Sequence, residues 1–144
     1  RRAALPRLGA LHGKRRPLLL KIAPDLAEAE LDAIAGAVLA AGIDGVICTN
    51  TTVERTAVAG QRHAGETGGL SGAPLFERST AVLSGMRERV GPELPLVGVG
   101  GIVEGTQAAA KIRAGATLVQ FYSGMIYRGP ALIAESVEAI RALR

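Results

Sequence analysis

The sequence of 144 residues contains no tryptophan, two tyrosines, two phenylalanines and a single cysteine, Cys48. One cysteine excludes an intramolecular disulfide and a cysteine-rich zinc site, and it is typical of a protein from a reducing compartment. The two histidines, His12 and His63, stand apart without the spacing of metal ligands, so we assign them no role and expect no metal site. With so few aromatic side chains and 19 glycines, the core is expected to consist of Leu, Ile, Val and Ala with many close backbone contacts.

Long hydrophobic runs are also absent. No apolar run approaches the about 18 residues of a transmembrane helix, so the chain itself is expected to be soluble, without a membrane-spanning segment. It begins at Arg1, with no initiator methionine and no leader peptide. This start indicates a fragment of a longer protein and leaves a membrane anchor upstream open.

The net charge of +4 is modest, and many of the basic residues lie in the first sixteen positions. We interpret the stretch 1–16 as a basic, solvated connection or helix end. Contact with nucleic acid or an anionic membrane is the alternative. Because no aromatic stacking residues are interleaved with the basic ones, no nucleic-acid partner is expected.

Short apolar runs alternate with stretches of helical spacing. The apolar runs are typical of buried strands and cover 17–23, 45–49, 94–99 and 117–122. The first helix is expected from Leu26 to Gly42, with Asp25 placed to cap it and Glu28 three residues later as in a capping box. Further helices are predicted at 74–90, 106–114 and 130–142.

This strand–helix order predicts parallel strands joined by right-handed crossovers, either in an open doubly wound sheet or in part of a (β/α)8 TIM barrel. A complete barrel needs about 250 residues, so residues 17–144 would form half of one as a single domain. Half a barrel leaves two strand edges and an apolar inner face open, which favours self-association or cover by a missing half. The glycine-rich segment 51–72 lacks apolar periodicity and is predicted to be a lid or binding loop.

Ligands of parallel α/β folds gather at the carboxyl ends of the strands, and here those ends are rich in glycine or polar residues. The third strand ends in the motif 98–102, Gly-Val-Gly-Gly-Ile, and the fourth ends in Tyr122, Ser123 and Gly124. Backbone N–H groups at such glycines can approach a phosphate closely, although a glycine pair after a strand is also a common tight turn. Together the two ends predict a phosphate site.

The first two strands carry the polar side chains of the candidate site. Lys21 interrupts an apolar run, so it either serves an anionic ligand or reaches the surface or a structural carboxylate. Thr49, Asn50 and Thr51 follow the second strand and suit a planar, amide-rich ligand such as a pyrimidine, or else they satisfy a local turn. Cys48 lies in the apolar strand without a nearby histidine, and we interpret it as a core residue.

Consecutive motifs of the chain resemble those of quinone-dependent (class 2) dihydroorotate dehydrogenases. The motifs occupy 21–26 (Lys-Ile-Ala-Pro-Asp-Leu), 49–52 (Thr-Asn-Thr-Thr), 67–72 (Thr-Gly-Gly-Leu-Ser-Gly), 98–102 and 119–124 (Val-Gln-Phe-Tyr-Ser-Gly). The resemblance covers the chain from Pro17 onward. It implies strands five to eight of a TIM barrel that binds FMN and oxidises dihydroorotate to orotate in pyrimidine biosynthesis, with a quinone reoxidising the flavin.

The resemblance also implies a role for each matching residue. Lys21 and Thr49 would contact the flavin ring, Gly72 would lie against FMN, and Asn50 and Thr51 would hold dihydroorotate or orotate. The phosphate of FMN would be bound by the last group of residues, Gly101, Tyr122 and Ser123.

In the family the catalytic base of class 2 members is a serine from the N-terminal half, and no residue here matches it. The quinone contacts belong to the same half, and class 2 members associate with the bacterial or mitochondrial inner membrane. The chain alone is therefore expected to be inactive. Two alternatives stay open: another FMN-dependent barrel acting on a pyrimidine, or a noncatalytic half-barrel that self-associates.

Overall fold

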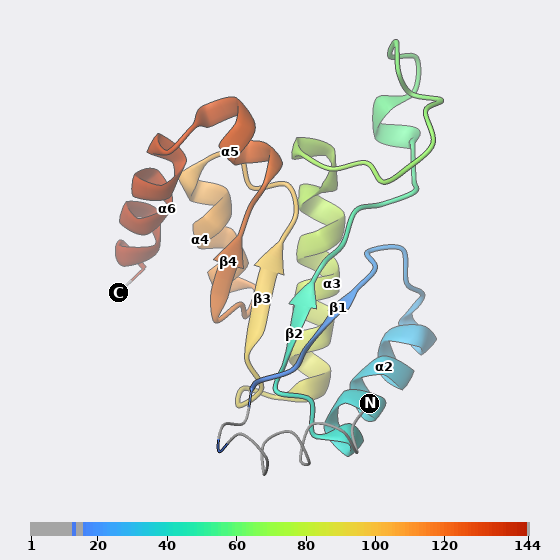
Figure 1. Cartoon of the computed structure of the whole chain (residues 1–144), viewed down its shortest axis with the longest axis vertical. Coiled ribbons are helices and arrows are strands. Elements are labelled where there is room, and N and C mark those ends of the chain that lie inside the picture. Colours follow the sequence, from blue (N-terminus) through green and yellow to red (C-terminus); the bar gives the residue numbers. More distant parts are fainter. Residues whose placement is uncertain (1–12, 14–15, 144) are drawn as a thin grey trace.

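The computed structural model describes residue 13 and residues 16–143, so His12 and nearly all of the basic stretch 1–16 lie outside the described residues. Four parallel strands form one sheet in the order β1-β2-β3-β4 (Figure 1). Their bounds are β1 (Leu19–Ile22), β2 (Gly45–Cys48), β3 (Leu96–Val99) and β4 (Leu118–Gln120). Because neighbouring strands run in the same direction, all four carboxyl ends meet at one edge of the sheet.

The helices follow the strands in alternation. They are α2 (Glu28–Ala41), α3 (Phe76–Val90), α4 (Gly105–Arg113), α5 (Ser123–Arg128) and α6 (Ala131–Arg141). Figure 1 shows α3 and α4 behind the sheet, with its other face toward the viewer. Helices on one face of a parallel sheet are the arrangement of part of a TIM barrel, as the sequence predicted.

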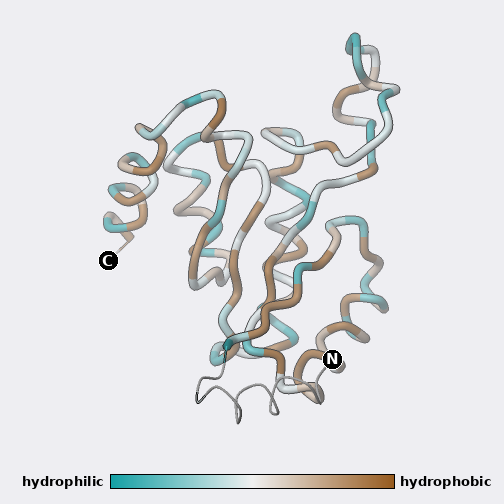
Figure 2. Tube along the Cα trace, in the orientation of Figure 1, coloured by the Kyte–Doolittle hydropathy of each residue, from teal (hydrophilic) through white to brown (hydrophobic). Residues whose placement is uncertain are grey.

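The hydrophobic core lies between the sheet and its helices. Leu83 and Met86 of α3 are fully buried against Val46 and Cys48 of β2 and Leu96 of β3. Each such side chain contributes about 1.5–3 kcal/mol by burial. Figure 2 shows hydrophobic residues along the strands and hydrophilic ones at the tip of the long loop.

The outer strands differ from the expected buried runs. In β1, Leu19 and Leu20 are 37% and 40% exposed, and Leu118 of β4 is 62% exposed. Each of these strands pairs with only one neighbour within the described chain. No further strand lies along its other edge to shield its apolar side chains. The prediction of open barrel edges is confirmed for residues 16–143.

The expected cap of the first helix is wrong. Ala27 is the N-cap of α2 and has no capping side chain, and Glu30 rather than Glu28 reaches back, with its carboxylate accepting from the Ala27 N–H at 2.8 Å. Asp25 instead binds the segment that follows β2. The predicted end of this helix is confirmed, because Gly42 adopts the left-handed conformation at φ 59°.

The segment 51–72 is an irregular loop with short helical turns. It contains η1 (Thr56–Val58) and is followed by η2 (Ala73–Leu75). An isolated antiparallel bridge joins Thr52 to Leu70, so the two ends of the loop lie side by side. The loop projects beyond the carboxyl edge of the sheet in Figure 1. Among the described helices, none is long and apolar enough to cross a membrane.

Candidate functional site

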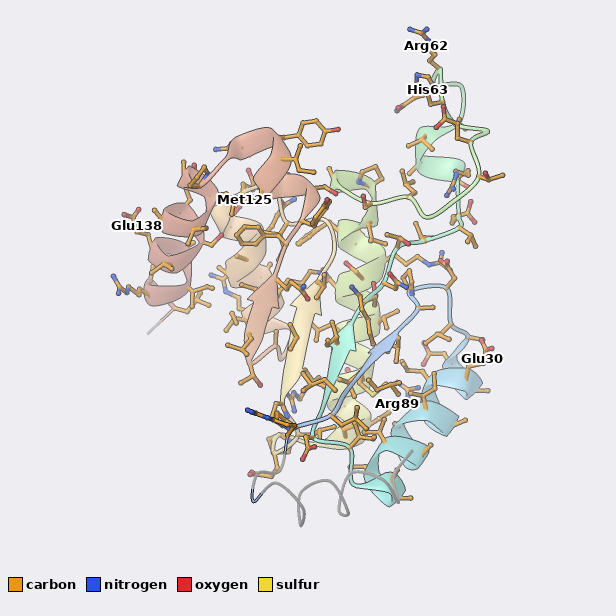
Figure 3. All side chains as sticks on the ribbon, viewed as in Figure 1. Glu30, Arg62, His63, Arg89, Met125 and Glu138 are labelled. Carbon is orange, nitrogen blue, oxygen red and sulfur yellow. The ribbon has the colours of Figure 1, made fainter. Side chains whose placement is uncertain are left out.

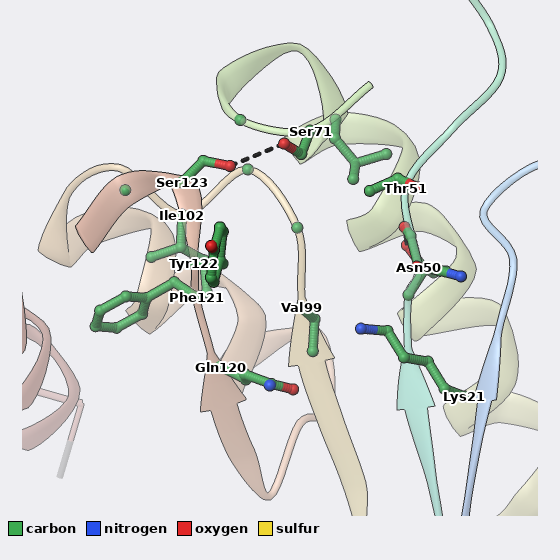
Figure 4. Close-up of a pocket in the computed structure, with 16 residues that line it drawn as sticks. Lys21, Asn50, Thr51, Ser71, Val99, Ile102, Gln120, Phe121, Tyr122 and Ser123 are labelled. Carbon is green, nitrogen blue, oxygen red and sulfur yellow. Dashed lines mark hydrogen bonds between the residues drawn. The ribbon is translucent and has the colours of Figure 1, made fainter. Parts of the chain in front are cut away.

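A pocket of about 360 Å³ lies at the carboxyl edge of the sheet (Figure 4). The ends of all four strands and the end of the long loop contribute to its wall. Every residue that the sequence predicted for the site lines this one pocket: Lys21, Thr49, Asn50, Thr51, Gly72, Gly101, Tyr122 and Ser123. The structure therefore brings together residues that are spread over about a hundred positions, because parallel strands share their carboxyl edge.

Lys21 supplies a positive charge to the pocket. Its side chain reaches from β1 across the pocket toward β3 in Figure 4. The residue is exposed, so the predicted conflict of a lysine in an apolar strand does not arise. β1 is an outer strand, and the Lys21 side chain stays exposed where it lines the pocket.

Backbone hydrogen bonds fix the segment that follows β2. The Thr49 N–H donates to the Val99 carbonyl at 3.0 Å, and the Asn50 N–H donates to the Ile22 carbonyl at 2.8 Å. Thr49 is buried, and its hydroxyl donates to the Asn50 carbonyl at 2.9 Å. The side chains of Asn50 and Thr51 are exposed at the pocket, so their polar groups can reach a ligand.

Asp25 links three segments behind this wall. Its carboxylate accepts from the Thr52 hydroxyl at 2.6 Å and from the Val53 N–H at 2.9 Å. It also forms an ion pair with Arg78 of α3 at 3.0 Å. These contacts hold the end of β1, which carries Lys21, against the end of β2.

A pair of hydroxyl groups closes the opposite wall. The Oγ atoms of Ser71 and Ser123 lie 2.9 Å apart and join the end of the long loop to the start of α5 (Figure 4). Gly72 has φ +85°, which favours glycine, and a Cβ built on it would lie 3.8 Å from Ser123. Tyr122 is 79% exposed beside this pair.

Close packing explains the glycines at the end of β3 and in α5. Gly101 has φ +78°, and a Cβ built on it would lie 2.3 Å from Phe76 Cα at the start of α3. A Cβ on Gly124 would lie 2.1 Å from the Ile102 carbonyl oxygen. The close approach that these glycines permit is therefore an approach to protein atoms, and access for a phosphate stays a prediction.

Sequence reasoning gave no separate role to two polar residues of the pocket, Ser71 and Gln120. No alternation of apolar and polar residues marks Gln120 in the sequence, because it follows the adjacent apolar residues Leu118 and Val119 of β4. Apolar side chains complete the lining, among them Leu75, Val99 and Ile102. The pocket thus combines a cation, amide groups and hydroxyls with an apolar wall, which suits a planar anionic ligand.

Cys48 and His63 take no part in the pocket. Cys48 is fully buried, and burial raises the pKa of its thiol to about 12, against a smaller opposing effect of Lys111 and Arg87. The prediction of a core cysteine is confirmed. His63 pairs with Glu66 at 2.6 Å and lies with Arg62 at the tip of the long loop (Figure 3). Within residues 16–143, no cluster of His, Cys, Asp and Glu could hold a metal ion.

Comparison with known proteins identifies relatives of the chain. The dihydroorotate dehydrogenase family matches residues 7–143. A dihydroorotate dehydrogenase (quinone) of Acidovorax sp. (strain JS42) is 55% identical over 137 residues, and one of Stenotrophomonas maltophilia (strain K279a) is 56% identical over 137 residues. Both matches cover 95% of this chain and 39% of the relative. The chain therefore spans well under half the length of these curated relatives.

Solved structures agree with the sequence relatives. The crystal structure of DHODH in complex with ferulenol from Eimeria tenella matches with a TM-score of 0.83 and 42% identity, over 90% of this chain and 34% of that chain. The ligand-free type from the same organism has the same TM-score and identity, over 89% and 35% of the two chains. These matches confirm the family resemblance and the TIM-barrel type of fold.

Proposed function

Because the chain belongs to the dihydroorotate dehydrogenase family, we propose that it forms the flavin- and pyrimidine-binding part of a quinone-dependent dihydroorotate dehydrogenase. The enzyme would oxidise dihydroorotate to orotate. The observation that carries this proposal is the convergence of all predicted site residues on one pocket. The chemistry of its lining, with Lys21 on one wall and the hydroxyls of Ser71 and Ser123 on the other, fits a flavin mononucleotide.

In this proposal the cofactor is FMN. Lys21 and Thr49 hold the flavin ring, and Gly72 lies against the cofactor. Its phosphate is held by Gly101, Tyr122 and Ser123. When bound, FMN supplies the capacity to accept a hydride from the substrate and to pass electrons to a quinone. The fixed charge of Lys21 stabilises negative charge that develops on the ring.

The same pocket holds dihydroorotate or orotate through Asn50 and Thr51. An asparagine amide both donates and accepts hydrogen bonds, as the edge of a pyrimidine requires. The long loop supports Thr51 directly, because a Cβ built on Gly69 would lie 1.8 Å from its hydroxyl oxygen. Gly69 therefore allows the loop to close against the substrate-binding residues.

The base that removes the substrate proton is not assigned to this chain. The hydroxyls of Ser71 and Ser123 are hydrogen bonded to each other, and the Cys48 thiol is buried with a pKa of about 12. We assign the base, the quinone contacts and the inner-membrane association to further segments of a longer enzyme. The 144-residue chain by itself would then bind ligands without turnover.

A direct test is titration of the chain with FMN and then with orotate. We expect a shifted flavin absorbance band that survives desalting. Lys21→Ala should weaken FMN binding by about tenfold, which is the value of a charged hydrogen bond, and Asn50→Ala should weaken orotate binding more than FMN binding. Arg62→Ala, at the exposed loop tip, is the matched control. If both pocket variants bind as the wild type does, these assignments are wrong.

A second proposal concerns assembly. Exposed leucines on the outer strands, Leu20 of β1 and Leu118 of β4, favour self-association of the half-barrel through its open edges. A second copy of the chain would cover the apolar side chains that the described sheet leaves open.

A further inference from the structure

The largest fully buried side chain among the described residues is that of a lysine, Lys111 of α4. Its Nζ donates to the Ser79 Oγ at 2.6 Å and to the Phe76 carbonyl at 3.5 Å, and it lies 5.1 Å from the centre of the Phe76 ring. All three partners are neutral. Burying a cation that is paired only with neutral groups costs free energy. Buried charged side chains of this kind are concentrated at functional sites.

A hydroxyl connects this lysine to the pocket. Ser79 is fully buried, and its Oγ accepts from Lys111. Its single hydroxyl hydrogen is shared between the Gly100 carbonyl at 3.0 Å and the Phe76 carbonyl at 3.1 Å. Gly100 lines the pocket and has φ +105°. A Cβ built on Gly100 would lie 2.9 Å from the Ser79 Oγ, so the turn packs closely against this hydroxyl.

The peptide geometry of the turn determines where the Gly101 N–H points. In a trans peptide, the C=O and the following N–H point to opposite sides. Because Ser79 binds the Gly100 carbonyl, the Gly101 N–H points away from Ser79 and α3. The Lys111–Ser79 pair thus fixes the orientation of a backbone donor in the segment that lines the pocket.

We propose that Lys111 is a positioning residue for an anionic phosphate at the Gly100–Gly101 turn, acting through Ser79 and through its buried positive charge. This inference rests on the proposed function, since the phosphate is that of FMN. Packing alone does not account for a lysine here, because methionine would fill a similar volume without burying a charge. The positive charge of Lys111 and its hydrogen bond to Ser79 instead stabilise the bound phosphate.

The test compares FMN with riboflavin, which has the same ring and no phosphate. We expect the wild-type chain to bind FMN more tightly than riboflavin. In Lys111→Met this preference should fall by about tenfold, the effect of one charge-assisted contact, while riboflavin affinity stays nearly constant. Arg113→Met is the matched control, since it removes the same charge from the exposed side of α4 and should keep the preference.

The outcomes separate the two proposals. If the wild-type chain does not prefer FMN, or binds neither flavin, the proposed function fails. If it prefers FMN and Lys111→Met keeps the full preference, the role of Lys111 is wrong and the proposed function stands. Ser79→Ala, which keeps the charge and removes the link, should also reduce the preference. If Ser79→Ala kept the full preference for FMN over riboflavin, the proposed link from Lys111 through Ser79 to the turn would be wrong.

A pH profile of the wild-type chain provides a test that needs no variant. Burial lowers the pKa of Lys111 to about 8, and the carboxylate of Glu77 of α3 raises it by a smaller amount. Cys48 of β2 would also raise it, but only as a thiolate. The phosphate stays doubly charged above its second pKa of about 6, and Cys48 stays protonated below about 12. The preference for FMN should therefore fall as pH rises through about 8. A preference that stays constant from pH 7 to 9.5 would overturn the proposal.

Discussion

At the scale of single residues, Lys111 opposes folding at neutral pH. Its pKa is about 8 in the fold against 10.5 in an exposed lysine, because burial disfavours the charged form. Between these two values the unfolded chain binds more protons than the folded one, so stability rises with pH across this range. Below pH 8 the full effect, about 3 kcal/mol, destabilises the fold.

We therefore predict that Lys111→Met raises the free energy of unfolding at pH 7, by about 1–3 kcal/mol after the lost hydrogen bond to Ser79 is allowed for. The difference between variant and wild type should shrink as pH approaches 10.5. Urea unfolding at several pH values measures it. Cys48 titrates in both proteins, so its effect largely cancels in the difference. A variant less stable than the wild type at pH 7 would contradict this view of Lys111.

The residue scale also shows where sequence reasoning stops. Lys21, Asn50 and Ser123 could be placed at one site from sequence alone, because strand ends of a parallel sheet meet whatever their separation along the chain. Asp25 could not, since its position before a helix matches a local cap as well as it matches its true partners. Those partners, Thr52 and Arg78, lie 27 and 53 positions away, and no local pattern reveals them.

At the scale of elements, the long loop depends on one guanidinium group. Arg55 donates to the carbonyl groups of Thr52 and Glu54 near the start of the loop and of Glu66 and Gly68 near its end. These bonds, with the Thr52–Leu70 bridge, keep the two ends of the loop together. The loop buries few side chains, so these polar contacts carry much of its order.

Arg55→Ala should loosen the loop without unfolding the core. Losing several exposed hydrogen bonds should favour local opening by about 1–2 kcal/mol. Limited trypsin digestion would show this as about tenfold faster cleavage after Arg62, with little change in thermal unfolding of the remaining chain. Arg113→Ala serves as the control. Equal cleavage rates would show that other contacts order the loop.

Element length decided which elements were predicted. The helices α2 and α3 repeat their apolar residues over several turns, and their existence followed from that spacing. The helix α5 has six residues, Ser123–Arg128, and was not predicted, because so short a segment shows no period. The strand β4 has three residues where six were expected, since the chain turns into α5 at its end.

At the scale of the whole molecule, the described sheet has helices on one face and two outer strands, each with one unpaired edge. We predict that the chain forms dimers or larger assemblies at micromolar concentration, and that Leu118→Lys shifts them toward monomer. Light scattering after size exclusion gives the mass. Leu39→Lys, on an exposed position of α2, is the matched control and should leave the assembly unchanged. A wild-type chain that is monomeric at every concentration would contradict self-association.

The position of the pocket relative to the core has a consequence for protein engineering. The core lies along the strands, whereas the pocket lies beyond their carboxyl ends, so most substitutions that alter the ligand need not disturb folding. Gly101 and Gly124 are exceptions, because they line the pocket and also pack against protein atoms. A mutant library that seeks new ligand specificity should keep these glycines and vary the exposed positions, such as Asn50, Thr51 and Gln120.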